Sequence, residues 1–356
     1  MSHSFVRVSG AVRFCSFLVW FAFAAGGCDN GPPALATGPL PGDSTPTTPP
    51  PDTTPQLPPP DTLPDTTATP PDTSSTPPDT VVENPPGTPP THVGLAFGPA
   101  QQAPTQWGPN VGATAYPAQP ESLLTWLQTA RQMNLRLFIS FTGSAEYLRN
   151  SNGFSLDLWK RRVDRFRGMN LQPYIDEGTI AGHLLLDEAD DKSNWNGHVV
   201  PVEYIDQMAQ YSKQIWPTMP TIVRAFPAYL DDYPHPYQYL DAVRVQYHAR
   251  FGDLDQFIES NVRLSKQLGL IVVGGLNVLK GGGPESGLPN PSDNTKFYMN
   301  PSQLRAWGKR FLSEPGLCGF LLWQYDPVYF SRPDIIAALN ELKQQAAALP
   351  NRACRD

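Results

Sequence analysis

The sequence predicts an α/β fold, a (β/α)8 or TIM barrel, on three observations. Short apolar runs alternate with longer amphipathic segments, which is the order expected when each strand is followed by a helix that leads to a parallel neighbour. This alternation fills residues 93–356, a length of 264 residues, close to the roughly 250 typical of such barrels. Most of the runs end in a polar or aromatic residue, as strands do at the end of a barrel where catalytic groups lie.

Seven apolar runs have the length and composition of strands that are buried on both faces. They lie at residues 93–97, 135–141, 182–188, 221–226, 242–248, 270–277 and 319–326. Between them, apolar positions at helical spacing predict six helices, at 121–133, 156–167, 202–215, 254–268, 302–312 and 333–348. An eighth strand is missing from the series, so we expect an irregular strand within 101–117 or an incomplete barrel. A doubly wound open sheet is the alternative, but residues 98–101 are not the glycine-rich phosphate loop that usually follows its first strand.

The amino-terminal residues predict export. Arg7 and Arg13 precede an apolar run at 14–25, which is too short for a comfortable membrane span and is typical of a secretion signal. The sequence Ala-Gly-Gly-Cys at 25–28 resembles a bacterial lipobox, which implies a signal peptide at 1–27 and a lipid anchor on Cys28. Cleavage at an ordinary signal-peptide site nearby is the alternative.

Residues 28–92 are expected to form a disordered Pro/Thr-rich stalk. Residues 31–92 hold 21 of the 41 prolines of the chain, and proline favours an extended polyproline II chain that builds no core. We therefore expect an exported lipoprotein of the bacterial cell envelope, periplasmic or at the cell surface. Its barrel, 93–356, would be held away from the membrane.

Charge and cysteine content bear on partners and on redox state. The formal net charge is −7, but residues 93–356 carry 25 acidic residues against 24 Lys and Arg, so the predicted barrel is nearly neutral. Without a basic face, nucleic acid is not an expected partner, and we expect a monomer. Cys318 begins the last predicted strand and Cys354 follows the last helix, so both should lie at the bottom of the barrel. This placement predicts a disulfide, with two free thiols as the alternative.

Several catalytic motifs are missing from the sequence. The six histidines form no H-x-H or H-E-x-x-H pair, so we expect no zinc hydrolase, no other metal and no cofactor. There is also no G-x-S-x-G nucleophile elbow and no phosphate-binding loop. The glycine-rich segment at 280–294 predicts either a mobile loop over the top of the barrel or a plain surface excursion.

The residues at the predicted strand ends are of the kinds that bind and cleave sugars. Aromatic faces stack on sugar rings, amides and guanidinium groups hydrogen-bond hydroxyls, and carboxyl groups catalyse glycosidic cleavage. The set is Asp187, Glu188, Arg224, Gln246, Tyr247, His248, Asn277, Trp323, Gln324, Tyr325 and Asp326. Each could be a core or capping residue instead, but their joint placement at one end of one sheet favours a substrate site.

The strand 182–188, of the form GxLLLDE, together with a tryptophan on the last strand, resembles secreted bacterial TIM barrels of the glycoside-hydrolase type. The resemblance covers about 93–348 and implies Glu188 as the general acid/base and Trp323 as the floor of a sugar site. Many such enzymes hold a nucleophilic glutamate at the end of the strand that corresponds to 270–277, and this chain has none there.

The sequence therefore does not decide which residue supplies the second catalytic carboxylate. Asp326 is preferred on its place at the end of the last strand, Glu285 lies on the glycine-rich segment, and Asp187 neighbours Glu188. Since adjacent residues of a strand point to opposite faces, Asp187 and Glu188 can both face the site only where the strand has already ended.

The sequence thus leads to a surface-anchored lipoprotein whose barrel binds a carbohydrate substrate and hydrolyses it. The alternative is a non-catalytic carbohydrate-binding or structural lipoprotein on the same scaffold. A third interpretation is a calcium site at Asp187, Asp190 and Asp191, which would need their oxygen atoms to converge on one point.

Overall fold

The computed structural model describes residues 92–107 and 112–355. The expected signal peptide at 1–27, Cys28 and nearly all of the expected stalk at 28–92 lie outside the described residues. Within the described part of the chain, no helix is both long and apolar enough to cross a membrane.

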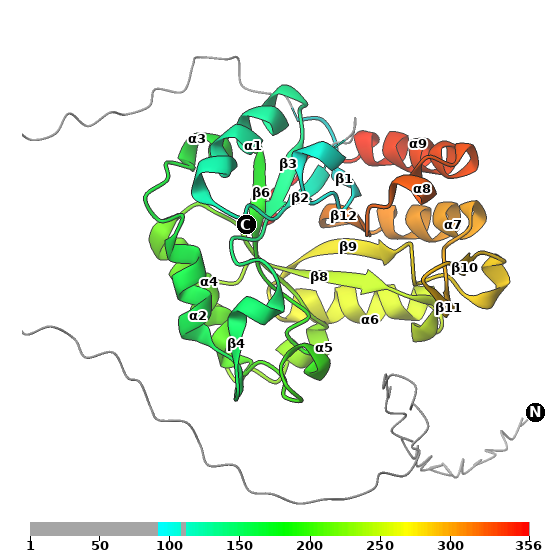
Figure 1. Ribbon diagram of the computed structural model, residues 1–356. Coiled ribbons are helices and arrows are strands. Elements are labelled where there is room, and N and C mark those ends of the chain that lie inside the picture. Colours follow the sequence, from blue (N-terminus) through cyan, green and yellow to red (C-terminus); the bar gives the residue numbers. More distant parts are fainter. Residues whose placement is uncertain (1–91, 108–111, 356) are drawn as a thin grey trace, which may run out of the picture. The chain divides into compact units, whose positions relative to one another are not determined.

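Eight parallel strands form one sheet that follows the chain order around a ring (Figure 1). Their order in space is β1 (Ala96–Pro99), β12 (Leu317–Trp323), β9 (Ile271–Asn277), β8 (Ala242–Tyr247), β7 (Thr221–Arg224), β6 (Ile180–Asp187), β3 (Arg136–Ile139) and β2 (Gly112–Ala115). The two ends of this order, β1 and β2, lie against each other, because a Cβ atom on Gly112 would stand 2.8 Å from the backbone nitrogen of Phe97. The sheet is therefore a nearly closed barrel, and its eighth strand, β2, lies within 101–117 as expected.

Helices cover the outside of the barrel between successive strands (Figure 1). The six expected helices are α1 (Pro120–Gln132), α2 (Leu156–Asp164), α4 (Glu203–Ile215), α6 (Leu254–Gln267), α7 (Pro301–Leu312) and α9 (Pro333–Ala348). Three short helices join them: α3 (Gln172–Asp176), α5 (Pro227–Leu230) and α8 (Pro327–Phe330). Proline stands in the first turn of many of these helices, where its missing N–H is not needed.

Shorter elements occupy the connections. Single 3-10 turns are η1 (Pro104–Gln106), η2 (Ala145–Leu148), η3 (Lys192–Asn194), η4 (Ala249–Phe251) and η5 (Pro284–Ser286). Two small antiparallel ladders pair β4 (Arg149–Asn150) with β5 (Gly153–Phe154), and β10 (Pro289–Asn290) with β11 (Asp293–Phe297). The glycine-rich segment is thus folded as a turn followed by a hairpin.

Side chains fill the interior of the barrel. Phe138 on β3 is fully buried there, and a Cβ atom added to Gly319 on β12 would lie 2.7 Å from its ring. A Cβ atom on Gly182 would lie equally close, 2.7 Å, to Ile222. Large side chains therefore pack against glycines inside the barrel, which leaves a packed core rather than a pore.

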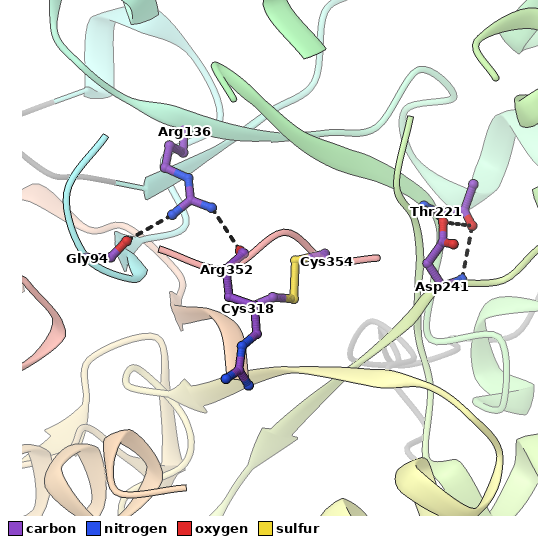
Figure 2. Close-up of a disulfide and its surroundings, with 7 residues drawn as sticks. All are labelled: Gly94, Arg136, Thr221, Asp241, Cys318, Arg352 and Cys354. Atoms are coloured by element: carbon purple, nitrogen blue, oxygen red, sulfur yellow. Dashed lines mark hydrogen bonds between the residues drawn. A yellow bond between two sulfur atoms is a disulfide. The ribbon is translucent and has the colours of Figure 1, made fainter. Parts of the chain in front are cut away.

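The carboxyl-terminal tail is attached to the amino-terminal ends of β12 and β3 (Figure 2). The predicted disulfide is present: Cys318 at the start of β12 is bonded to Cys354, with their Cα atoms 5.1 Å apart. Arg136, the first residue of β3, donates hydrogen bonds to the backbone oxygens of Gly94 (3.1 Å) and Arg352 (3.2 Å). The tail is thus fixed at this end, whereas the polar residues predicted at strand ends lie at the opposite end of the strands.

Candidate functional site

The site begins where β6 ends. Asp187 is the last residue of this strand, and Glu188 has a backbone φ of 52°, a left-handed conformation that side chains with a Cβ atom rarely adopt. The Glu188 carbonyl oxygen accepts a hydrogen bond of 2.9 Å from the buried indole of Trp195. The chain therefore turns at Glu188, and the strict alternation of strand faces stops there.

As a result of this turn, both carboxylates reach one guanidinium group. Arg224 Nη1 lies 2.6 Å from Glu188 Oε1 and 3.3 Å from Asp187 Oδ1. Arg224 ends β7 and is the direct cross-strand partner of Asp187. Glu188 Oε2 also accepts a hydrogen bond of 3.0 Å from Asn194. Because β6 ends at Asp187, both Asp187 and Glu188 can face the same site, as the sequence analysis required.

The protonation of these acids follows from their partners. Burial raises the pKa of Glu188, but the charge of Arg224 and the hydrogen bonds from Arg224 and Asn194 outweigh it, so its pKa lies below the ordinary value. Asp190 is affected in the opposite direction, because burial outweighs the hydrogen bond from the Phe226 N–H and raises its pKa. Two acids near each other thus have pKa values pushed apart, a pattern found in pairs that divide acid and base roles.

Two cavities open at this end of the barrel. The first, of about 410 Å³, is lined by residues of β6, β7, β8 and β12 and of the loops that follow β1, β2, β3 and β6. Its lining includes Gln102, Tyr116, Ser140, Thr142, Asp187, Glu188, Asn194, Trp195, Arg224, Arg244 and Trp323. The second, of about 400 Å³, is lined by Glu188, Asp190, Asp191, Lys192, Arg224, Phe226, Arg244, Gln246, His248, Arg250 and Phe251, among others. Glu188, Arg224 and Arg244 line both, so these three residues form a wall that the two cavities share.

Five further residues of the predicted set do not line either cavity. Asp326 accepts a hydrogen bond from the Tyr329 N–H and so caps α8. The Tyr325 ring stacks on Phe330, and Gln324 follows Trp323 across a cis peptide bond.

Tyr247 and Asn277 have structural partners. Tyr247 is 3 % exposed and donates to the Gly252 carbonyl oxygen. Asn277 Nδ2 lies 3.1 Å from His248 Nε2, and Asn277 Oδ1 accepts a hydrogen bond from the Lys280 N–H. Asn277 therefore orients His248, which lines the second cavity. Burial lowers the pKa of His248 to about 4, which leaves this imidazole neutral at neutral pH.

Glu285 lies away from both cavities. Its carboxylate accepts a hydrogen bond of 2.6 Å from Gln303, the residue that completes the capping box of α7. The residues described for the glycine-rich segment contribute nothing to the lining of either cavity. Of the two expectations for this segment, the surface excursion agrees with the structure, in which the segment ends in the β10–β11 hairpin and lines neither cavity.

Several cavity residues were not among the predicted ones. Ser140 and Thr142 follow the end of β3, Tyr116 follows β2, and Arg244 stands in the middle of β8. A sequence signal existed for Arg244 alone: a charged residue inside an otherwise apolar strand that is buried on both faces. The other three stand in loops, where polar residues carry little information.

No group of three or more His, Cys, Asp or Glu side chains between residues 92 and 355, with the gap at 108–111, is arranged to hold a metal ion. The three aspartates of the calcium interpretation have separate partners. Asp187 pairs with Arg224, Asp190 accepts from the Phe226 N–H, and Asp191 accepts from Ser193.

Comparisons with known proteins bear on the fold. No protein-family model matches the chain, and no curated protein matches it. Among solved structures, an endocellulase from Pyrococcus horikoshii has a TM-score of 0.46 at 11 % identity, covering 72 % of this chain and 93 % of its own. An intracellular xylanase from Thermoanaerobacterium saccharolyticum has a TM-score of 0.45 at 13 % identity, covering 65 % and 86 %. A β-mannanase from Thermomonospora fusca has a TM-score of 0.42 at 12 % identity, covering 66 % and 78 %. A likeness this weak carries no conclusion about function.

Proposed function

We propose that this barrel binds a glycan and hydrolyses a glycosidic bond in it. One observation supports the proposal above all: Glu188, an ionised carboxylate, stands at the strand ends in the wall between two cavities. Trp323, which is partly exposed, lines the first cavity beside it, and an indole ring is suited to packing against a sugar ring. Serine, threonine, tyrosine and amide groups complete the lining and match the hydroxyl groups of a sugar.

The charge of Glu188 decides its role. A general acid has to keep its proton near neutral pH, whereas the pairing with Arg224 lowers the pKa of Glu188. We therefore assign Glu188 the part of the ionised carboxylate, which attacks the sugar or activates water. Asp190, whose pKa burial raises and which lines the second cavity with Glu188, is our candidate for the acid that protonates the leaving oxygen. Asp326 is the weaker candidate because its carboxylate caps α8.

The test is turnover on a panel of polysaccharides and aryl glycosides. Glu188→Gln keeps the shape of the side chain and removes its charge, and should lower kcat/KM at least about a thousand-fold. Asp190→Asn should remove the alkaline limb of the pH profile and should affect aryl glycosides with good leaving groups least. Glu341→Gln, which breaks a surface ion pair with Arg305 on the outside of the barrel, is the matched control and should leave turnover unchanged. Unchanged turnover in Glu188→Gln would remove the basis of the proposal.

A non-catalytic glycan-binding barrel is the second candidate, and one observation favours it. Arg224 engages both Asp187 and Glu188, which could make the acids a structural ion-pair cluster. If no glycan of the panel is cleaved, yet wild type and Glu188→Gln bind one of them equally tightly by calorimetry, this second function is the correct one.

We further propose that the chain is a lipoprotein held in the bacterial envelope through Cys28, with the proline-rich stretch as its spacer. The support is the sequence pattern Ala-Gly-Gly-Cys after the apolar run at 14–25. Cys28→Ser should move the protein from the detergent phase to the aqueous phase when cells that express the full chain are extracted with Triton X-114. Equal partition of both proteins would refute the anchor.

A further inference from the structure

Arg244 is the least expected residue in the site. It lies in the middle of β8, is 1 % exposed and lines both cavities. Its Nη2 donates one hydrogen bond of 3.3 Å to Gln246, and its Nε has no partner. Among the described residues, no carboxylate lies within ion-pair distance of it. A guanidinium group has five N–H donors, so most of the hydrogen-bonding capacity of Arg244 is unused.

The register of the sheet explains why Arg244 lacks a counter-ion. Asp187, Arg224 and Arg244 are direct neighbours on β6, β7 and β8, so one row across the sheet reads acid, arginine, arginine. Both nearby carboxylates, Asp187 and Glu188, bond to Arg224. Arg244 is left as the second of two adjacent like charges, an arrangement that destabilises a sheet.

Burial of this charge is costly, and the protein keeps it nonetheless. A buried charge without a partner strongly destabilises the folded state. Burial lowers the pKa of Arg244, and the charges of Asp187 and Glu188 oppose this shift. A guanidinium group is not deprotonated in proteins, so the charge persists. The Arg244 guanidinium lies 5.8 Å from the centroid of the Trp323 ring, which holds it at the wall of the first cavity. Such unused, preorganised donors are what a planar anion requires.

We propose that Arg244 binds an anionic group of the substrate, so that the glycan taken by this barrel is acidic. A uronic acid carboxylate matches the guanidinium fork best, and a sulfate ester presents the same chemistry. The inference rests on the proposed glycan function and adds the substrate class to it. Because Arg244 and Glu188 stand in the same wall, the charged sugar unit would be one of the two that flank the cleaved bond.

The test uses the purified protein and pairs of probes that differ in charge alone. Oligogalacturonate and hyaluronan are compared with their carboxyl-reduced forms, chondroitin sulfate with its desulfated form, and xylan and cellulose oligosaccharides serve as neutral probes. Affinity is measured by calorimetry, independently of turnover. We expect an acidic probe to bind at least about ten-fold more tightly than its neutral form, the effect of one charged hydrogen-bonded contact. A preference for carboxylated or for sulfated probes identifies the source of the anion, and equal or tighter binding of the neutral forms would overturn the proposal.

Variants separate recognition from structure. Arg244→Gln should lose the preference for the acidic probe, Arg244→Lys should keep part of it, and Arg305→Gln, on the outer surface, should keep all of it. Since Arg244 is buried without a carboxylate partner, Arg244→Gln should unfold at the same or higher urea concentration than wild type, whereas a structural arginine would leave a less stable protein. If Arg244→Gln fails to fold, the wild-type comparison of paired probes still decides.

The two proposals can fail separately. Binding of an acidic probe without any turnover would refute the hydrolase and keep the role of Arg244. Cleavage of neutral glycans by both wild type and Arg244→Gln would refute the role of Arg244 and keep the hydrolase.

Discussion

Reduction of the disulfide should lower the stability of the barrel without altering its site. The bond joins Cys318 and Cys354, which are 36 positions apart in sequence, and it anchors the carboxyl-terminal tail at the amino-terminal end of the barrel. The chain-entropy relation gives about 4 kcal/mol for a loop of this length. With a denaturant slope of about 3 kcal/mol per molar urea, the unfolding midpoint should fall by roughly 1 M.

The assay is urea unfolding followed by tryptophan fluorescence, with and without dithiothreitol. A Cys318→Ala, Cys354→Ala double variant should unfold near the midpoint of the reduced wild type and should not respond to the reductant, which controls for effects of the reagent. Glycan affinity under native conditions should be equal in both redox states, because the bond and the cavities lie at opposite ends of the strands. Identical midpoints for oxidised and reduced protein would show that the hydrogen bonds of Arg136 hold the tail without help from the disulfide.

Three further predictions concern the framework. Burial lowers the pKa of His183 from 6.5 to about 3, so the folded protein loses stability as pH falls below 6.5. In His183→Gln, the slope of the unfolding free energy against pH between pH 6.5 and 4 should be smaller by up to about 1.4 kcal/mol per pH unit. An unchanged slope would contradict this. Asp206 is 6 % exposed and accepts hydrogen bonds from three backbone N–H groups, at 238–240. Asp206→Ala should lower the free energy of unfolding in urea by about 3 kcal/mol or more. A loss under about 1 kcal/mol would mean that water replaces the carboxylate. Gly112→Ala should push β2 off β1 and cost about 1 to 3 kcal/mol, while Gly168→Ala, where nothing lies within 4 Å of the added atom, is the control and should cost nothing.

The regular elements could be predicted because hydrophobic periodicity reports burial directly. All six long helices were located within a few residues, as were seven strands, since each is either amphipathic or buried on both faces. β2 carries the sequence Gly-Ala-Thr-Ala and gives no such signal, because its small residues are there to let β1 approach. The short helices α5 and α8 were missed for another reason: each is a single turn that follows a strand, below the length at which periodicity can be recognised.

The candidate site could be predicted in part. Strand ends indicated six residues that line a cavity: Asp187, Glu188, Arg224, Gln246, His248 and Trp323. Choosing residues at strand ends also selected some that cap a helix or pack in the core, such as Asp326 and Tyr247. The sequence does not show in which direction the chain, and so each side chain, leaves the end of a strand.

The backbone conformation at Glu188 explains why the arrangement of Asp187 and Glu188 could not be predicted from the sequence. The alternation of strand faces predicts that Asp187 and Glu188 diverge, and the φ of 52° at Glu188 removes that constraint. Once both reach Arg224, one guanidinium group serves two carboxylates, and Glu188 is held ionised. The same convergence deprives Arg244 of the acid that its place in the row would give it. The ionised state of Glu188 and the unpaired charge of Arg244 therefore have one cause, the pairing of both acids with Arg224. Arg224→Gln should change both: it should raise the pKa of Glu188 and leave an acid free to pair with Arg244. A shifted acidic limb of turnover together with a weakened preference for acidic probes in that variant would be the signature of this coupling, and a change in only one of them would show that the two arginines act independently.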